Sequence, residues 1–495
     1  MNKYRIYRDL ALSDRPKTAP PPRRVAALGT LRRASRQKKR PDMTWRDHLA
    51  MLLHIGAEIE HSLMVQYLYA AYSLGGEQVP PQHRAMVARW QASILAVAKE
   101  EMGHFLTVQN ILTFIGAPIN LERQELPWDA PFYPFPFRLE RLTLDSLAHY
   151  VYAEMPVPRQ GSGPGKHPRK AALGRAIKRA MRGAKVPPHR VGELYDELIA
   201  LIADNDRIPD SVFQENTYTW QASSDDWGRG YQPNPKRLDA AGTVIEPKAK
   251  RGKPSDEAHV MIDRVATRDQ ALEALKRLSQ QGEAPVFIDG QSDEPSHFDR
   301  FLAIYEDLEK VRGWEPSIPV ASNPTVAIDP NNRRHRGYIS AKHPREWASL
   351  FNLRYRMLLK FLAHTFRLAR VERVDTPNLR AMVMHRVFGE MYNLKTIAGI
   401  LVRLPQRAGG GRAQANRAGP PFEIPYTLHL GTSELDVWIN HRDLIASSQR
   451  ICQTMLHSGA PDQDYLRALF DLDSQTRKWI ERIIAGLRSS ERPYE

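Results

Sequence analysis

The sequence predicts an all-α protein, built on a four-helix bundle with long insertions and followed by a second helical domain at the C-terminal end. Apolar residues recur at spacings of three and four over many long stretches, as expected for helices that bury one face. Prolines and glycines separate these stretches. Two of the stretches carry a Glu-x-x-His step, Glu101 to His104 and Glu294 to His297, which puts polar groups on otherwise apolar helices.

Composition divides the chain into four parts. Residues 1–42 form a basic, proline-containing flexible arm, and residues 43–315 hold the bundle, with insertions at 157–190 and 206–256. A proline-rich linker covers 316–344, and residues 345–495 form the helical C-terminal domain. We expect this last domain to pack on the bundle, to complete a pocket or to form a homodimer interface.

The predicted helices of the bundle part are bounded by helix breakers. They cover about 44–75, 82–116, 144–154, 188–204 and 267–281, and a further helix starts near Asp293. Four helical stretches are predicted after the linker. His364, His385 and Glu390 lie in apolar surroundings there, but no helical spacing joins them. They are interpreted as polar residues of a core or interface, and not as a second site.

The first half of a candidate metal site follows from helical spacing. Glu101 and His104 are three residues apart and share one helix face, as do Glu60 and Tyr67, which are seven apart. The neighbouring positions are apolar, and a carboxylate on a core-facing stripe is costly unless it is paired or bound to a metal. Glu60, Glu101 and His104 are therefore predicted metal ligands.

The second half of the site has several candidate glutamates. Glu294 and His297 repeat the spacing of the first pair, and Glu193 is the predicted ligand from a further helix. Glu197 lies one turn after Glu193 on the same face, and Glu154 and Glu215 are alternatives. One glutamate from each of two helices and a Glu-x-x-His from each of two others form the ligand set of a dinuclear site. Carboxylate and imidazole ligands favour two iron ions, with manganese as the alternative and zinc left open.

Charge and cysteine content limit the function classes. The 495 residues carry a net charge of +15, much of it in residues 23–40 and in the insertion, and such segments are usually solvated. A basic arm could contact an acidic partner or a carrier protein, whereas no nucleic-acid-binding motif is present. The single cysteine, Cys452, excludes intrachain disulfides. No membrane span or signal peptide is found, so cytoplasmic residence is expected.

Residues 206–254 read as a long excursion without helical or strand periodicity. Its Trp220, Trp227 and Tyr231 argue against plain disorder, because disordered segments contain few aromatic residues. We therefore expect the excursion to cover the metal site and to shape substrate access.

Five stretches, in this order, carry a resemblance to a known family: EIEHSLMVQYLYAAYSL, AVAKEEMGHFLTVQNILTFIGAP, VGELYDELI, QGEAP and EPSHFDRFLAIYEDL. Residues 43–315 resemble the ferritin-like domain associated with iminophenyl-pyruvate dimer synthases of bisindole pigment biosynthesis. The resemblance implies that Glu60, Glu101, His104, Glu193, Glu294 and His297 bind metal and that Tyr67 supports the ligands or lines the pocket as a candidate catalytic residue. The chain departs from the family in its basic insertion and in its shorter length.

The predicted function is that of a dinuclear non-haem iron or manganese oxidase or oxygenase. It would use dioxygen on a small molecule, and the resemblance implies secondary metabolism with an amino-acid-derived imine or a carrier-bound intermediate as substrate. A manganese catalase or a ferroxidase would use the same ligands. A non-catalytic helical scaffold in a biosynthetic complex is the alternative from a different class.

Overall fold

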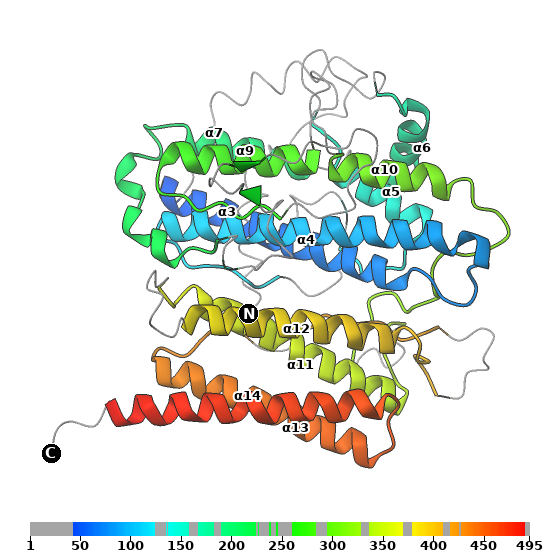
Figure 1. Cartoon of the computed structure of the whole chain (residues 1–495). Helices are drawn as coiled ribbons and strands as arrows, with labels where there is room; N and C mark the ends of the chain where they lie inside the picture. Colours follow the sequence, from blue (N-terminus) through cyan, green and yellow to red (C-terminus); the bar gives the residue numbers. More distant parts are fainter. Residues whose placement is uncertain are drawn as a thin grey trace.

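The computed structural model describes residues 43–123, 135, 137–157, 167–182, 190–223, 226, 237–238, 244–245, 260–283, 295–327, 336–369, 379–408, 416–424 and 427–490. Helices dominate this part of the chain, and its only named strands are the two-residue antiparallel pair β1 (Arg237–Leu238) and β2 (Val244–Ile245). The predicted all-α fold is confirmed. The helices stack in layers whose axes run in similar directions (Figure 1).

The central pair of the bundle consists of α3 (Trp45–Ser73) and α4 (Arg84–Phe114). The hydroxyl of Thr44 accepts a hydrogen bond from the Asp47 amide and caps the start of α3. Gly75 and Gly76 have φ values of 96° and 101°, which favour glycine, and they turn the chain toward η2 (Pro81–His83) and α4. The two long helices therefore run antiparallel, side by side.

Two shorter helices complete the bundle. α5 (Leu144–Ala153) and α10 (His297–Leu308) pack on each other, and α10 also contacts α4. Tyr67 of α3 joins them, because its ring lies 4.9 Å from that of Tyr150 in α5 and 4.8 Å from that of Phe301 in α10, measured between centroids. The centre of the bundle is thus bounded by α3, α4, α5 and α10.

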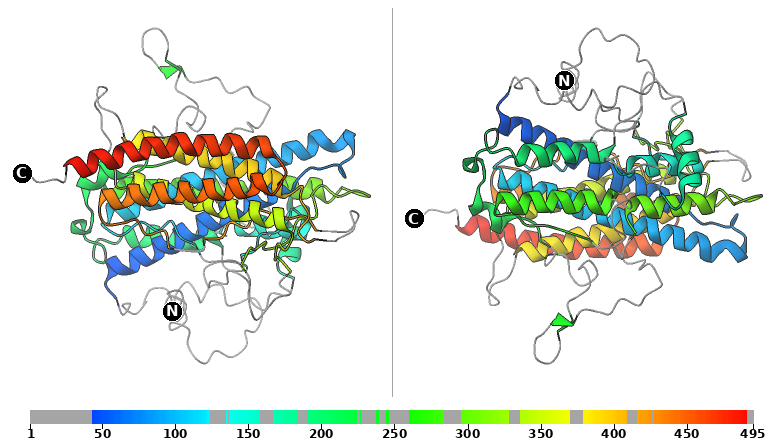
Figure 2. Two further views of the ribbon diagram at one scale, coloured as in Figure 1. Left: turned by 90° about the horizontal axis from the view of Figure 1, so that it is seen from below. Right: turned by 90° about the horizontal axis from the view of Figure 1, so that it is seen from above.

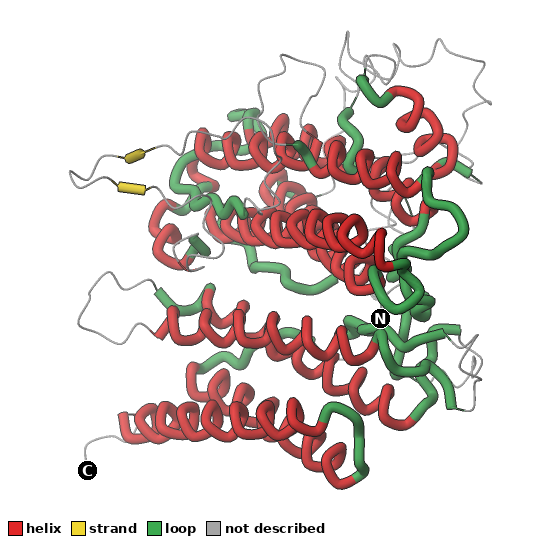
Figure 3. The backbone as a smooth tube through the Cα atoms, turned by 45° about the vertical axis from the view of Figure 1, so that its right-hand side comes forward, coloured by secondary structure: helices red, strands yellow, loops and turns green. Residues whose placement is uncertain are grey.

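Parts of α3 and α4 are buried on every side. Every residue from 56 to 63 in α3 and from 100 to 112 in α4 is buried. A helix that is enclosed all round lies between two packing partners. The partners here are the remaining bundle helices on one side and the C-terminal helices on the other, as Figure 3 also shows.

The insertions add helices to the outside of the bundle. α6 (Lys170–Ala180) lies in the basic insertion and packs on α5 and α10 through small apolar residues, whereas its lysines and arginines face outward. α7 (Val191–Ile202) packs on α3 and on α9 (Arg268–Glu283). The excursion begins with η4 (Asp210–Val212) and η5 (Glu215–Trp220). The basic insertion is therefore not solvated throughout, because α6 buries one face.

The C-terminal helices form two pairs below the bundle. α11 (Lys342–Thr365) pairs with α12 (Leu379–Leu401), and α13 (Glu434–His457) pairs with α14 (Gln463–Ser490). Figure 2 shows α13 and α14 on the lower face, with α7 and α9 on the opposite face. Buried Arg354 of α11 joins the pairs, since its guanidinium contacts Glu390 of α12 and Asp473 of α14. The predicted second helical region is confirmed.

One apolar core runs through both layers. It includes Phe105 of α4 and Leu358 of α11, and polar contacts cross the same boundary. Tyr355 of α11 hydrogen-bonds to His61 of α3, and Arg123 donates a hydrogen bond to the Tyr355 hydroxyl over 3.3 Å. The helices of the C-terminal part therefore support the outer side of α3 and α4.

Most helix predictions match the structure to within a few residues, with one displacement at the start of α10. Ser296 caps that helix through the Asp299 amide, so α10 begins at His297 and not near Asp293. The basic arm, much of both insertions, Trp227, Tyr231 and Glu294 lie outside the described residues. The boundaries of the four predicted parts remain predictions. Among the described helices, none is long and apolar enough to cross a membrane.

Candidate metal centre

Five buried Glu and His side chains meet at the centre of the bundle in two groups that share Glu101. One group contains Glu60, Glu101 and His104, and the other contains Glu101, Glu154 and His297. In each group one ligand atom from every residue lies within 4.8 Å of the others. These residues come from α3, α4, the end of α5 and the start of α10, so all four bundle helices contribute.

Local helix geometry places each of these side chains. Glu101 and His104 lie one turn apart on the inner face of α4. Glu154 directly follows the last residue of α5 as its C-cap, and its backbone amide donates to the carbonyl of Tyr150. His297 is the first residue of α10, directly after its serine cap. Two of the side chains therefore stand at helix ends, where the caps fix the backbone.

The carboxylate of Glu101 lies between the two imidazoles. Its Oε2 is 3.1 Å from His104 Nδ1, and its Oε1 is 2.8 Å from His297 Nδ1. The outer carboxylates lie further away: Glu60 Oε2 is 3.5 Å from His104 Nδ1, and Glu154 Oε2 is 3.8 Å from His297 Nδ1. Each half-site thus has one outer glutamate and one histidine, and the two halves share Glu101.

The outer nitrogen of each imidazole has a hydrogen-bond partner. His104 Nε2 lies 2.8 Å from Gln281 Oε1 at the end of α9, and His297 Nε2 lies 2.9 Å from Glu100 Oε2. Glu100 is fully buried and is also 3.0 Å from Arg300 Nη1. Partners of this kind fix the tautomer and ring orientation of a metal-binding histidine, and here they would leave Nδ1 of each ring free to bind a cation.

Two tyrosines hold the outer glutamates in a matching way. The hydroxyl of Tyr195 in α7 donates a hydrogen bond to Glu60 Oε1, and the hydroxyl of Tyr67 donates one to Glu154 Oε1. Each glutamate therefore has one oxygen held by a phenol. The other oxygen, Oε2, is the one that faces the nearby histidine.

Several inward-facing atoms lack hydrogen bonds. Glu60 Oε2, Glu101 Oε1 and His297 Nδ1 are buried and have no hydrogen-bond partner among the described residues. Although Glu101 Oε1 and His297 Nδ1 are close, their directions do not make a hydrogen bond, and both atoms aim into the space between the residues. Buried polar atoms are almost always satisfied, so such a convergence fits bound cations. Carboxylate oxygen and imidazole nitrogen together suit iron or manganese.

Burial and mutual charge shift the pKa values of these groups when only protons are bound. Burial, followed by the charge of Glu101, raises the pKa of Glu60 to about 7. Burial opposes protonation of His104, but Glu101 and Glu60 outweigh it and raise its pKa to about 10. Burial likewise opposes protonation of His297, but Glu101, Glu100 and Glu154 hold its pKa well above the ordinary value. Without metal, the raised pKa values of His104 and His297 favour protonated imidazoles at neutral pH.

The space beside these groups is small. A cavity of about 20 Å³ is bounded by the Glu/His groups and by residues of α7 and α9, among them Gly192, Tyr195, Leu278 and Gly282. This volume accommodates about one water molecule. A Cβ added to Gly282 would lie 3.2 Å from Glu154 Oε2, so the end of α9 approaches the site closely. A larger molecule would therefore need the end of α9 or the start of α7 to move.

The structure brings together four of the six predicted ligands, Glu60, Glu101, His104 and His297, with Tyr67 beside them. It does not bring Glu193 to them: that side chain is exposed on α7, whereas Tyr195 of the same helix points inward. Glu154 stands where Glu193 was expected. Glu197 is partly exposed, Glu215 is exposed, and Glu294 is outside the described residues.

Sequence reasoning left four contributors unassigned. Glu154 was only an alternative, although it follows Tyr150 and Val151 by four and three residues and so continues the buried stripe of α5. Glu100 forms a doublet with Glu101, and helical spacing does not distinguish their roles. Gln281 and Tyr195 lie in two of the stretches that carry the resemblance, QGEAP and VGELYDELI, but no helical spacing ties them to the ligands, because their roles depend on how α7 and α9 pack.

The bundle and its shared-glutamate site define a class of protein. Residues 53–306 match the family model described as Ferritin-like, which covers half of the chain, and the chain belongs to this family. The residues that carry the site all lie within the matched range.

Two curated relatives resemble the chain beyond the bundle. Dichlorochromopyrrolate synthase of Lentzea aerocolonigenes is 26% identical over 410 residues, which are 77% of this chain and 36% of the relative. The 2-imino-3-(indol-3-yl)propanoate dimerase of Chromobacterium violaceum is 22% identical over 408 residues, 76% of this chain and 34% of the relative. The match thus spans about a third of each relative. A ferritin-like protein from Caulobacter vibrioides is a structural neighbour, with 16% identity, a TM-score of 0.37, and coverage of 70% of this chain and 94% of the neighbour.

Proposed function

We propose that this chain is a dinuclear non-haem metal oxidoreductase that holds two iron ions, with manganese as the alternative, and oxidises a small organic molecule with dioxygen. The observation that carries the proposal is the position of Glu101 between two buried Glu/His pairs. A carboxylate that presents one oxygen to each of two half-sites is suited to bridge two cations.

The choice of metal rests on the donor set. The site offers carboxylate oxygens and imidazole nitrogens, and Cys452 lies on α13 in the other layer, away from the site. Hard and intermediate donors of this kind favour iron or manganese over metals that prefer thiolates. When bound, such metals supply one-electron redox chemistry and activation of dioxygen.

The protein itself supplies position, charge balance and exclusion of water. Tyr67 and Tyr195 hold Glu154 and Glu60 by one oxygen each, and Glu100 and Gln281 hold the two imidazoles. Three carboxylates and two neutral imidazoles would carry a total charge of −3, against +4 for two divalent cations. Because the adjoining cavity accommodates about one water molecule, bulk solvent has little access to this charge.

The substrate class is suggested by the curated relatives. One is called a synthase of dichlorochromopyrrolate and the other a dimerase of 2-imino-3-(indol-3-yl)propanoate. By similarity to these relatives, we propose that the substrate of the present chain is an amino-acid-derived imine or a similar small molecule of secondary metabolism. We also retain the proposals that the protein works in the cytoplasm and that its basic arm, outside the described residues, contacts an acidic partner or a carrier protein.

Metal analysis tests the proposal directly. Protein purified without chelator and incubated anaerobically with ferrous iron is expected to hold about two iron ions per chain, as the shared-carboxylate site predicts. Glu101→Ala removes the carboxylate common to both halves and should lose most of this metal while its far-ultraviolet circular dichroism stays helical. Glu193→Ala, on the exposed side of α7, is the matched control and should retain the metal.

Two results would contradict the proposal. Wild-type protein without any bound transition metal would indicate a scaffold whose Glu/His groups are only ion-paired. Two bound metals combined with rapid peroxide turnover and no oxygen-dependent oxidation of small molecules would indicate a catalase.

A further inference from the structure

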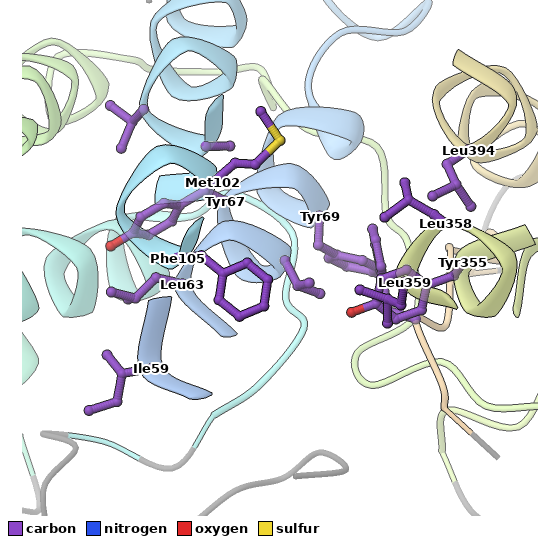
Figure 4. Close-up of a cluster of buried hydrophobic side chains, with 14 of the residues drawn as sticks. Ile59, Leu63, Tyr67, Tyr69, Met102, Phe105, Tyr355, Leu358, Leu359 and Leu394 are labelled. Atoms are coloured by element: carbon purple, nitrogen blue, oxygen red, sulfur yellow. The ribbon is translucent and has the colours of Figure 1, made fainter. Parts of the chain in front are cut away.

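An apolar cavity of about 240 Å³ lies between the two layers of helices. On one side it is lined by α3 and α4, and on the other by α11 and α12. In Figure 4, Met102 and Phe105 lie on one side, and Leu358, Leu359 and Leu394 face them from the other. None of the Glu/His groups of the candidate metal centre lines this cavity, so it is a separate site on a different face of α3 and α4.

The helical spacing of the lining residues explains why the cavity is continuous. Leu95, Ala98, Met102 and Phe105 follow one another at intervals of three and four along α4. On α11, Leu358 and Leu359 lie three and four residues after Tyr355, and Leu362 lies four and three residues after them. Two packed layers usually interdigitate and leave few voids larger than a water molecule. The space here is larger than such voids and reaches the surface at Lys99, Tyr392 and Lys395, so a small molecule has room to enter it.

The wall is apolar and adaptable. Met64, Met102 and Met391 line it together with leucines, and methionine side chains adjust readily to ligands of different shape. The phenol of Tyr355 also belongs to the wall, but its hydroxyl is already hydrogen-bonded to His61 and Arg123. The wall thus favours an apolar body without polar groups along its length.

The charged residues of the cavity have one sign. Lys99 of α4 and Lys395 of α12 are exposed members of the lining, and no Asp or Glu is found among the described lining residues. Tyr392 lies beside Lys395 with 64% of its surface exposed, more than any other large hydrophobic side chain among the described residues. An apolar interior with an exposed cationic and aromatic edge matches a molecule that has an apolar body and an anionic end.

We propose that this cavity binds an amphipathic carboxylate whose body is a bicyclic aromatic group or an apolar group of similar size. Cavities of about 150 Å³ lined by aliphatic and aromatic side chains bind benzene, so the larger volume here is suited to two fused rings. The carboxylate lies toward Lys99 and Lys395. This inference does not depend on the metal or on the proposed function.

Calorimetric titration with naphthylacetate and its neutral analogue naphthylethanol tests the inference. Wild-type protein is expected to bind both and to prefer the anion, with a preference that weakens as salt is raised. The Lys99→Gln/Lys395→Gln variant should bind naphthylacetate about three- to tenfold more weakly, the range expected for two exposed ion pairs, and bind naphthylethanol as before. Lys478→Gln, an exposed lysine of α14 outside the lining, is the matched control and should change neither affinity.

A second variant separates this cavity from the metal centre. Met391→Trp fills the partly exposed edge of the cavity and should weaken both probes, whereas Glu101→Ala should weaken neither. Unchanged naphthylacetate binding in the double lysine variant would overturn the anionic part of the inference. Binding that is lost in Glu101→Ala but kept in Met391→Trp would assign the ligand to the metal centre and overturn the inference entirely.

Discussion

At the scale of single residues, the site depends on which side chains point inward from helices that carry several acids. Glu100 and Glu101 are consecutive and both buried, yet Glu101 contacts the inner nitrogens of both histidines, whereas Glu100 contacts the outer nitrogen of His297 and the guanidinium of Arg300. Their roles differ because consecutive helical positions point about 100° apart. Neighbouring carboxylates in one helix thus have different partners, and in the proposed metal centre Glu101 would be shared by the two halves while Glu100 would support His297.

The metal content of variants at Glu154 and Glu193 tests which glutamate belongs to the second half-site. Glu154→Gln should reduce the bound metal from about two ions per chain to about one, because one outer carboxylate is lost while Glu60 and His104 remain. Glu193→Gln should leave the metal content unchanged, since its side chain is exposed. Elemental analysis of both variants after anaerobic iron loading checks this. A loss of metal in Glu193→Gln alone would restore the sequence-based assignment.

Metal binding should release protons and weaken as the pH falls. The pKa of His104 is raised to about 10 without metal and that of His297 is also raised, so both imidazoles carry a proton at neutral pH. A cation must displace these protons, and the affinity therefore rises with pH. Titration calorimetry in two buffers of different ionisation enthalpy should show between two and three protons released at neutral pH, one from each imidazole and a fraction of one from Glu60, whose pKa is about 7. Binding without proton release would contradict this account.

Four of the inward-facing residues could be predicted from the sequence, because the pattern of apolar residues around each of them is local. Glu60, Glu101, His104 and His297 stand on periodic apolar stripes, and helical geometry alone puts them inside. The identity of the third glutamate, Glu154 or Glu193, could not be predicted in this way, because it depends on whether α5 or α7 forms part of the bundle. α5 has ten residues and α7 has twelve, both carry acids, and only tertiary packing selects α5.

At the scale of elements, one face of α4 binds the segment that follows the 206–254 excursion. Gly103, Thr107 and Asn110 lie four and three residues apart and face residues 260–265. Thr107 accepts a hydrogen bond from the Asp263 amide over 3.0 Å, and Asn110 donates one to the Asp263 carbonyl over 2.8 Å. The returning segment therefore lies directly beside the face of α4 that carries His104.

Two glycines at helix-interior positions should respond to alanine in opposite ways. A Cβ at position 103 would lie 2.4 Å from the Met261 carbonyl oxygen, which is backbone and cannot move without shifting the segment. Gly103→Ala should therefore destabilise the protein by about 1–3 kcal/mol. Gly399→Ala in α12 meets nothing within 4 Å and should stabilise it by about 0.5–1 kcal/mol. Urea unfolding of both variants measures these changes, and equal effects would argue against the close approach.

At the scale of the whole molecule, buried Arg380 connects the excursion to the C-terminal helices. Its guanidinium donates to the carbonyls of Gln221 over 2.8 Å and Thr365 over 2.9 Å, and it lies 3.2 Å from Asp226. One side chain thereby satisfies backbone groups from segments far apart in the sequence. This connection could not be predicted from the sequence, because nothing in the residues around Arg380 indicates that its side chain is buried.

Arg380→Met is expected to destabilise both layers together. The substitution leaves several buried carbonyls and Asp226 without a cationic partner, which costs about 3–5 kcal/mol. Arg477→Met, at an exposed i,i+4 pair with Glu481, is the control and should cost less than about 1 kcal/mol. Calorimetry should show a single transition that shifts downward in Arg380→Met. Two separated transitions in the wild type would indicate that the layers unfold independently.

The enclosure of α3 and α4 on both sides has an evolutionary consequence. Residues 56–63 and 100–112 face either the Glu/His groups, the bundle core or the other layer, so no position there faces only solvent. Substitutions in these two windows must satisfy two sets of neighbours at once, whereas exposed positions of α6 or α14 are far less restricted. As related chains diverge, these windows should change most slowly, and new specificities should arise from the insertions and the helices that surround them.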